Sequence, residues 1–265
     1  MMKYYKIINR LSLILVLAGL ACGAPGCKSK EAEQQQPASA GESAPELIAQ
    51  ADKLYAERED LTRLRAGIAL LRRARALEPG QYEAAWRNSE FDYYLGAHTS
   101  DEGERDKAFQ DGAEAGKAAV ALRPEKPEGH FWLGANYGGS AQHSTLAGLT
   151  SIDDITTEME TVLKLDEGYQ GGSAYMALGQ LYLEAPRMLG GDPQKGVAFL
   201  EKGLRFGQNN SLLRLHLAEA YIAVKRNDEA RKQLDAIDAL KPDPDYLPEH
   251  KETLAAAAKL RSQLQ

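Results

Sequence analysis

Hydrophobic and polar positions divide the chain into three parts. Leu11 to Leu20 form a short apolar run behind three basic residues, Lys3, Lys6 and Arg10. Residues 28–46 read KSKEAEQQQPASAGESAPE, with no aromatic residue and no apolar periodicity. Beyond them, apolar and small residues recur at helical spacing, and long β-branched runs are missing. We therefore expect a signal segment over 1–21, a flexible tether over 22–44 and an all-α domain over 45–265.

The helical part contains an internal repeat, which four segments show: AAWRNSEFDYYLG from Ala84, GHFWLGANYGG from Gly129, AYMALGQLYLEA from Ala174, and RLHLAEAYIAVKRNDEARKQLDAIDALKPD from Arg214. In three of them a small residue stands three positions before a tyrosine, as in Gly179 and Tyr182. In the segment from Ala84, Glu90 takes the place of the small residue before Tyr93. Small residues at a fixed position indicate helices that approach closely.

The clearest unit resembles the tetratricopeptide repeat (TPR), a helix pair of roughly 34 residues. Leu217, Ala218 and Tyr221 lie in its first predicted helix, and Leu234 and Ile237 lie in its second. Because no pair buries its apolar face alone, such pairs stack into a superhelical solenoid. We predict five pairs and a C-terminal capping helix from Glu249 to Leu264. The pairs span 45–79, 81–124, 126–167, 170–209 and 211–242, with extra residues at 98–107, 138–151 and 184–192.

The stretch LYLEAPRMLGGDPQKGVAFL, residues 181–200, is the one place that suggests a phosphate-binding loop. Such a loop needs G-x-x-x-x-G-K-[ST] after a buried strand, and this segment is helical with no Ser or Thr in place. We interpret it as a turn between helices instead. Asp192 is the predicted N-cap, Pro193 takes the first helical position, and Gly196 allows a close helix contact.

The same region resembles a particular TPR family. Residues 165–172 read LDEGYQGG, and residues 185–195 read APRMLGGDPQK. These two turns are similar to those of TPR lipoproteins associated with TRAP-type transporters, the T component. The resemblance implies a lipid-anchored periplasmic α-helical protein, a solute-binding protein as its partner, a small apolar or amphipathic ligand, and a homo-oligomer as one available assembly.

The N-terminus resembles a bacterial lipoprotein signal, in which a cysteine becomes the lipidated first residue. The apolar run ends in LAGLACGAPGCKSK, and Cys22 follows it directly, with Cys27 as the alternative. An ordinary secretory signal or an uncleaved anchor is the other interpretation. Gly23 stands where an inner-membrane retention signal would have Asp, which favours the outer membrane. Since these are the only two cysteines, lipidation of either one excludes an internal disulfide.

Charge narrows the choice of partners. Cleavage before Cys22 would remove three of 32 basic residues and none of 38 acidic ones, so the mature chain would carry a net charge of −9. Nucleic-acid binding rests on basic surface, and we therefore expect no nucleic-acid partner. The five histidines show no metal-ligand spacing, and the Ser beside His143 has no nucleophile motif around it. We expect no metal, no cofactor and no catalytic residue.

The first helices of TPR pairs line the concave face of the stack. Placing Tyr93, Tyr137, Tyr182 and Tyr221 at equivalent positions predicts which residues face this groove, with Ala135, Leu215 and Glu219 beside the main set. The main candidates for binding a ligand or partner are Arg87, Phe91, Tyr94, Phe131, Met176 and Gln180. The alternative is that these side chains simply pack against one another. Trp86 and Trp132 are predicted core residues.

We therefore expect a non-enzymatic, lipid-anchored periplasmic TPR protein that binds a partner protein or a small amphipathic ligand in its concave groove. The resemblance favours an accessory to TRAP-type solute uptake. The alternative is a scaffold for the assembly of outer-membrane, secretion or pilus components. TPR motifs identify a fold far better than they identify a function.

Overall fold

The computed structural model describes residues 42–143 and 151–264. The predicted signal segment, both cysteines and nearly all of the predicted tether lie outside these residues. The described part belongs to one compact unit, Ala38–Gln265. It contains eleven α-helices, two short 3-10 helices and no strand. None of the described helices is both long and apolar enough to cross a membrane.

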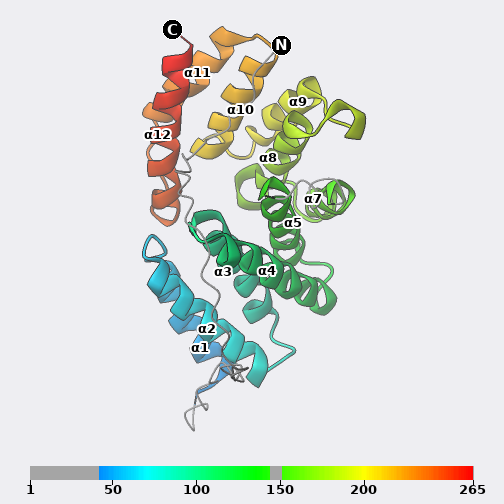
Figure 1. The fold of residues 1–265 in the computed structure, drawn as a ribbon, viewed down its shortest axis with the longest axis vertical. Helices are drawn as coiled ribbons and strands as arrows, with labels where there is room; N and C mark the ends of the chain where they lie inside the picture. Colours follow the sequence, from blue (N-terminus) through cyan, green and yellow to red (C-terminus); the bar gives the residue numbers. More distant parts are fainter. Residues whose placement is uncertain (1–41, 144–150, 265) are drawn as a thin grey trace, which may run out of the picture. The chain divides into compact units, whose positions relative to one another are not determined.

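The helices form the five predicted antiparallel pairs, followed by a single C-terminal helix (Figure 1). The first helices of the pairs are α1 (Ala44–Tyr55), α3 (Tyr82–His98), α5 (Pro127–His143), α8 (Tyr169–Glu184) and α10 (Ser211–Ala223). Their partners are α2 (Leu61–Leu77), α4 (Glu102–Leu122), α7 (Ile152–Leu165), α9 (Pro193–Gly203) and α11 (Asn227–Asp238). The last helix is α12 (Leu247–Gln263), and η1 (Arg187–Leu189) and η2 (Pro244–Tyr246) are the 3-10 helices.

Capping side chains fix where the helices begin. Asp192 accepts hydrogen bonds from the backbone N–H groups of Gln194 and Lys195, and Pro193 follows it, as predicted. Asp101 caps α4 and Asn210 caps α10 in the same way. Each cap satisfies an N–H group that has no partner within its own helix. The first helix of the fourth pair ends at Glu184, and Met188 lies in η1.

The turn that leads into α8 depends on left-handed backbone. Gln170, Gly171 and Gly172 have φ values of 44°, 62° and 80°. A Cβ on Gly172 would lie 2.6 Å from the carbonyl oxygen of Gly203. Glycine is needed here both for its conformation and for the close approach of α9. The backbone geometry of this turn therefore explains the last two glycines of GYQGG, the second half of the LDEGYQGG sequence at residues 165–172.

Small residues stand where the two helices of a pair approach each other, as predicted. A Cβ on Gly196 of α9 would lie 2.9 Å from the carbonyl oxygen of Gly179 of α8. In the third pair, a Cβ added to Gly134 would lie 2.6 Å from the Cε of Met159 on α7. The backbones of α8 and α9 therefore lie close together at Gly196, and a larger side chain there would force them apart. At Gly134 the added atom would meet the flexible end of Met159 instead.

In the second pair the predicted register is wrong by one residue. Ser89, which is fully buried, donates a hydrogen bond of 2.7 Å to the carbonyl oxygen of Gly112 on α4. Ser89 therefore occupies the small-residue position between the helices that Glu90 was predicted to hold. The shift turns Trp86 and Glu90 towards the concave side, at positions equivalent to Phe131 and Ala135.

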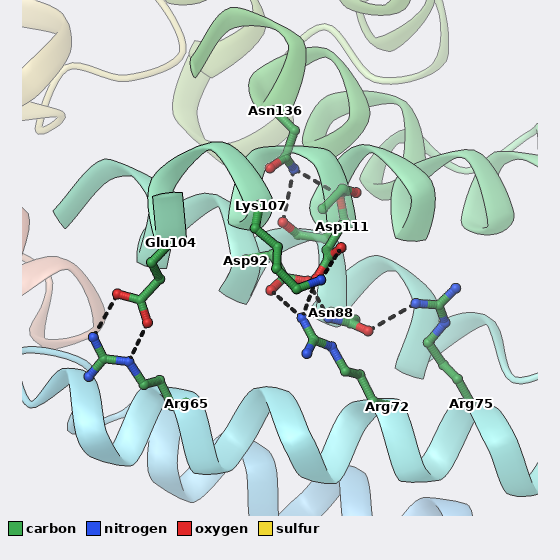
Figure 2. Close-up of polar contacts among 11 residues, drawn as sticks. Arg65, Arg72, Arg75, Asn88, Asp92, Glu104, Lys107, Asp111 and Asn136 are labelled. Atoms are coloured by element: carbon green, nitrogen blue, oxygen red, sulfur yellow. Dashed lines mark hydrogen bonds and ion pairs between the residues drawn. The ribbon is translucent and has the colours of Figure 1, made fainter. Parts of the chain in front are cut away.

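A polar network joins the first two pairs and fixes the position of α3 (Figure 2). Arg72 on α2 lies 3.3 Å from the carboxylate of Asp92 on α3 and 2.7 Å from that of Asp111 on α4. Asn88 donates a 2.6 Å hydrogen bond to Asp92, and Arg75 donates one of 2.9 Å to Asn88. Because Asn88 and Asp92 are buried and each group of the network is hydrogen-bonded to another, we interpret the network as structural.

The C-terminal helix packs against α10 and α11, and side chains of its first turns contact the loop between α1 and α2. Arg58, in the loop after α1, is only 5% exposed and forms a two-point ion pair with Glu249 of α12, at 2.9 and 2.8 Å. An exposed ion pair of 3.2 Å between Glu59 and Lys251 lies near it. The two ends of the stack therefore contact each other.

Candidate binding cavity

The concave side of the helix stack encloses a cavity of about 1490 Å³. Its wall includes residues from the first helices of all five pairs, from α7 and from α12. The first helices contribute because consecutive pairs stack with these helices on the inner side. A volume of this size exceeds the range of ordinary small-molecule pockets, about 300–1,000 Å³.

All six predicted groove residues lie in the wall of this cavity: Arg87, Phe91, Tyr94, Phe131, Met176 and Gln180. They are not equally accessible. Phe91 is 1% exposed and stacks on Tyr55 of α1 at a centroid distance of 4.2 Å, so most of its ring belongs to the core. The one-residue register shift explains this burial. Whether any of the six contacts a ligand stays a prediction.

Aromatic rings line the middle of the cavity. The Phe131 and Trp132 rings lie 5.0 Å apart, edge to face, and Tyr93 lies 5.6 Å from Trp132. Trp132 and Trp86 were predicted as core residues, and both lie in the wall of the cavity, Trp132 with 8% exposure. The Trp132 indole N–H is buried and has no hydrogen-bond partner among the described residues. Such a group costs free energy unless something accepts its hydrogen bond.

Arg87 is held in place from two sides. Its Nε donates to a carboxylate oxygen of Asp52 on α1 at 2.8 Å, and its guanidinium lies 4.3 Å from the centre of the Trp86 ring. The ion pair leaves little of its charge uncompensated. Arg58, in the same wall, is likewise paired with Glu249 and lies 4.8 Å from the ring centre of Tyr55.

Glu90 is a cavity residue that the sequence analysis missed. It lies on α3, half-buried, and faces the cavity. Desolvation raises the pKa of its carboxyl group to about 8, and the neighbouring Arg87 and Arg58 oppose that rise only in part. One feature of the sequence pointed to Glu90: it stands where the other repeats have a small residue.

The far end of the cavity carries polar groups from α8 and α10. Gln180 lies 2.9 Å from Nε2 of His216, and Nδ1 of His216 lies 2.8 Å from Glu219. Leu215 also lines the cavity, as predicted, whereas Glu219 is not part of the wall. Burial raises the pKa of Glu184, which lies in the wall at this end.

No cluster of three or more potential metal ligands occurs within residues 42–143 and 151–264. His130 illustrates how the histidines are used. One of its ring nitrogens lies 2.6 Å from Glu158, and the other lies 2.9 Å from the carbonyl oxygen of Pro124. Its contacts therefore join α5 to α7 and to the preceding loop. The Ser beside His143 lies outside the described residues.

Comparison with known proteins identifies one family and one fold. A family profile described as TAtT, TRAP transporter T-component, matches residues 47–261. No curated protein sequence matches the chain. A thermophilic TPR protein from Thermus thermophilus is 22% identical, with a TM-score of 0.59, and the match covers 80% of this chain and 100% of that one. The pilF protein of Pseudomonas aeruginosa is 16% identical, with a TM-score of 0.52 over 83% of this chain and 93% of that one. At these identities the two structures support a TPR-type helical fold alone.

Proposed function

Because the chain belongs to the family of TRAP transporter T-components, we propose that it is a non-catalytic binding protein of TRAP-type solute uptake. Its family and its TPR fold support a role in protein–protein interaction with transporter components. In the fuller form of the proposal, it binds a periplasmic solute-binding protein and holds a small amphipathic ligand in its cavity. The observation that carries the proposal is that the family match, residues 47–261, spans almost every helix that lines this cavity.

The cavity suits an amphipathic ligand for three reasons. Its volume of about 1490 Å³ leaves room for a metabolite-sized molecule. Phe131, Met176 and Leu215 provide apolar surface, and Arg87, Glu90 and Gln180 provide polar groups. Pockets of this kind gain affinity from apolar contact and orient the ligand through a few polar groups.

The partner proposal is tested with a TRAP-type solute-binding protein from the same organism. We expect the two purified proteins to form a complex that native mass spectrometry detects, with or without a co-purified small molecule. Failure to form any complex at micromolar concentrations would contradict the transporter role. A complex with secretion or pilus components instead would favour the assembly scaffold.

The ligand proposal is tested with two cavity variants. Phe131→Glu and Met176→Glu should weaken retention of a small molecule, because each replaces apolar cavity surface with a charge, and should leave the helical circular dichroism signal unchanged. Arg63→Glu is the control for an added glutamate, because Arg63 is half-exposed on α2 and does not line the cavity. Equal loss of binding in the control would count against the cavity as the site.

We also propose that Cys22 carries the lipid and holds the protein on the periplasmic side of the envelope, at the outer membrane. The sequence LAGLAC before Gly23 motivates this proposal. We expect Cys22→Ser to release the protein into the soluble periplasmic fraction, and Cys27→Ser to leave it with the membranes. The reverse result would assign the lipid to Cys27.

A further inference from the structure

Acidic side chains outnumber basic ones in the wall of the cavity. Among the described residues, six carboxyl groups line it: Asp52, Glu90, Glu184, Asp243, Glu249 and Glu252. Three arginines line it: Arg58, Arg87 and Arg205. Arg205 is exposed, and the other two are paired with Glu249 and Asp52 at 2.8 Å each. A negatively charged ligand would therefore find Arg58 and Arg87 already paired with carboxylates.

Glu90 takes part in neither of these two ion pairs. Arg87 and Arg58 lie near it, but Arg87 donates to Asp52, and Arg58 forms its two-point ion pair with Glu249. The Tyr55 hydroxyl is a hydrogen-bond partner of Glu90. Asp52 adds a like charge that opposes ionisation of Glu90, and the Tyr55 hydroxyl beside it is neutral. A buried carboxylate is stabilised when a cation lies beside it. The cavity wall therefore has a place for one further positive charge.

Aromatic rings stand around the same place. Trp86 and Tyr93 share helix α3 with Glu90, and Phe131 and Trp132 face them from α5. The Trp86 ring already holds the guanidinium of Arg87 at 4.3 Å. Aromatic faces attract ammonium and guanidinium groups most strongly where water is excluded. Carboxylate and rings together favour an organic cation over a strongly hydrated metal ion.

We propose that the cavity binds a small cationic amphiphile, with its ammonium group beside Glu90 and the aromatic side chains and its apolar body along Phe131 and Met176. This inference rests on the proposed ligand-binding role of the cavity and names the class of ligand. We expect organic acids to bind there more weakly than organic cations with the same apolar body.

Three probes that share one apolar body test the charge of the ligand: 4-phenylbutylamine, 4-phenylbutanol and 4-phenylbutyrate. The two tryptophans of the chain both line the cavity, so tryptophan fluorescence reports binding in the wild-type protein. At pH 8 we expect the amine to bind at least about tenfold more tightly than the acid, with the alcohol between them. Equal binding of amine and acid, or tighter binding of the acid, overturns the proposal.

Two glutamine variants locate the charge. Glu90→Gln should remove the preference for the amine over the alcohol, with unchanged helicity. Glu83→Gln is the control, because Glu83 is exposed on the same helix and does not line the cavity. A preference that survives in Glu90→Gln overturns the assignment of Glu90.

The same experiments separate this inference from the proposed function. If the acid binds best, the cavity is a ligand site and only the cationic class is wrong. If none of the probes binds, the cationic class is overturned, and the transporter role is decided by the complex with the solute-binding protein.

Discussion

Gly196 shows how closely the two helices of one pair approach each other. Its backbone lies against α8, and a Cβ at this position would lie 2.9 Å from the carbonyl oxygen of Gly179. That oxygen belongs to the backbone and cannot move aside as a flexible side chain would. We expect Gly196→Ala to lower the free energy of unfolding by about 1–3 kcal/mol, because even one added methyl group overpacks the contact. Urea denaturation measures the change.

Gly138 on α5 is the matched control for that substitution. It also lies within a helix, but no heavy atom lies within 4 Å of an added Cβ. Gly138→Ala should raise stability by up to about 1 kcal/mol, because alanine loses less conformational entropy in a helix. Similar effects at both positions would contradict the close contact at Gly196.

Glu90 makes a second prediction at the scale of one residue, on how stability depends on pH. Desolvation raises its pKa from 4.5 to about 8 in the folded protein. Between these values the unfolded chain releases a proton that the folded protein keeps, so this group's contribution to stability falls as pH rises. We expect Glu90→Gln to be close to wild type at pH 4.5 and more stable by roughly 1–3 kcal/mol at pH 8.

Urea denaturation of Glu90→Gln and wild type at pH 4.5, 6 and 8 checks this sign. Glu83→Gln, which removes an exposed carboxyl group from the same helix, should show no such trend. A stability difference between Glu90→Gln and wild type that stays constant with pH would show that Glu90 is hydrated in the folded protein.

At the scale of the helix, the repeat pattern predicts most of what the structure contains. Small residues such as Gly179 and Ala218, set three positions before a tyrosine, predict the pairs and their order. The pattern fails in the second pair, where serine and glutamate are adjacent and either could be placed between the helices. Ser89 is there because its hydroxyl reaches the carbonyl oxygen of Gly112. That contact depends on where α4 lies, which the local sequence does not determine.

The residues of the first helices that line the cavity were predicted from the sequence. The contact between the two ends of the stack was not. Arg87, Phe131, Met176 and Gln180 follow from helix periodicity once the register of each pair is known. The contact between Arg58 and Glu249 joins residues 191 positions apart. It depends on small rotations that add up from pair to pair along the stack. No spacing in the sequence contains that information.

The prediction at the scale of the helix concerns α12. Glu249→Gln would remove the two-point ion pair between Glu249 and the buried guanidinium of Arg58. We expect a loss of about 2–3 kcal/mol, below the roughly 3–5 kcal/mol of fully buried pairs because Glu249 is 27% exposed. Glu59→Gln removes the exposed ion pair with Lys251 and should cost less than about 1 kcal/mol. Thermal unfolding of the two variants checks the difference.

At the scale of the whole helical unit, contact between its ends changes how it should unfold. An open stack of repeats transmits stability only between neighbouring pairs, so its ends open independently. Here the first pair and α12 share the buried ion pair of Arg58 and Glu249 and the exposed pair of Glu59 and Lys251. The apolar cluster of α1–α4 and that of α8–α12 are therefore linked through contacts other than the intervening pair.

Amide hydrogen exchange read by mass spectrometry tests this linkage. In the wild type we expect α1–α2 and α12 to exchange together, with similar opening free energies in mild urea, because opening either end breaks the shared ion pairs. In Glu249→Gln, α12 should open first while α1–α2 keep their protection, since α12 then rests on α10 and α11 alone. Independent opening of the two ends in the wild type would mean that the ion pairs add no cooperativity. The cavity would then be open to solvent along α12 for part of the time, and ligand entry would need no further movement of the stack.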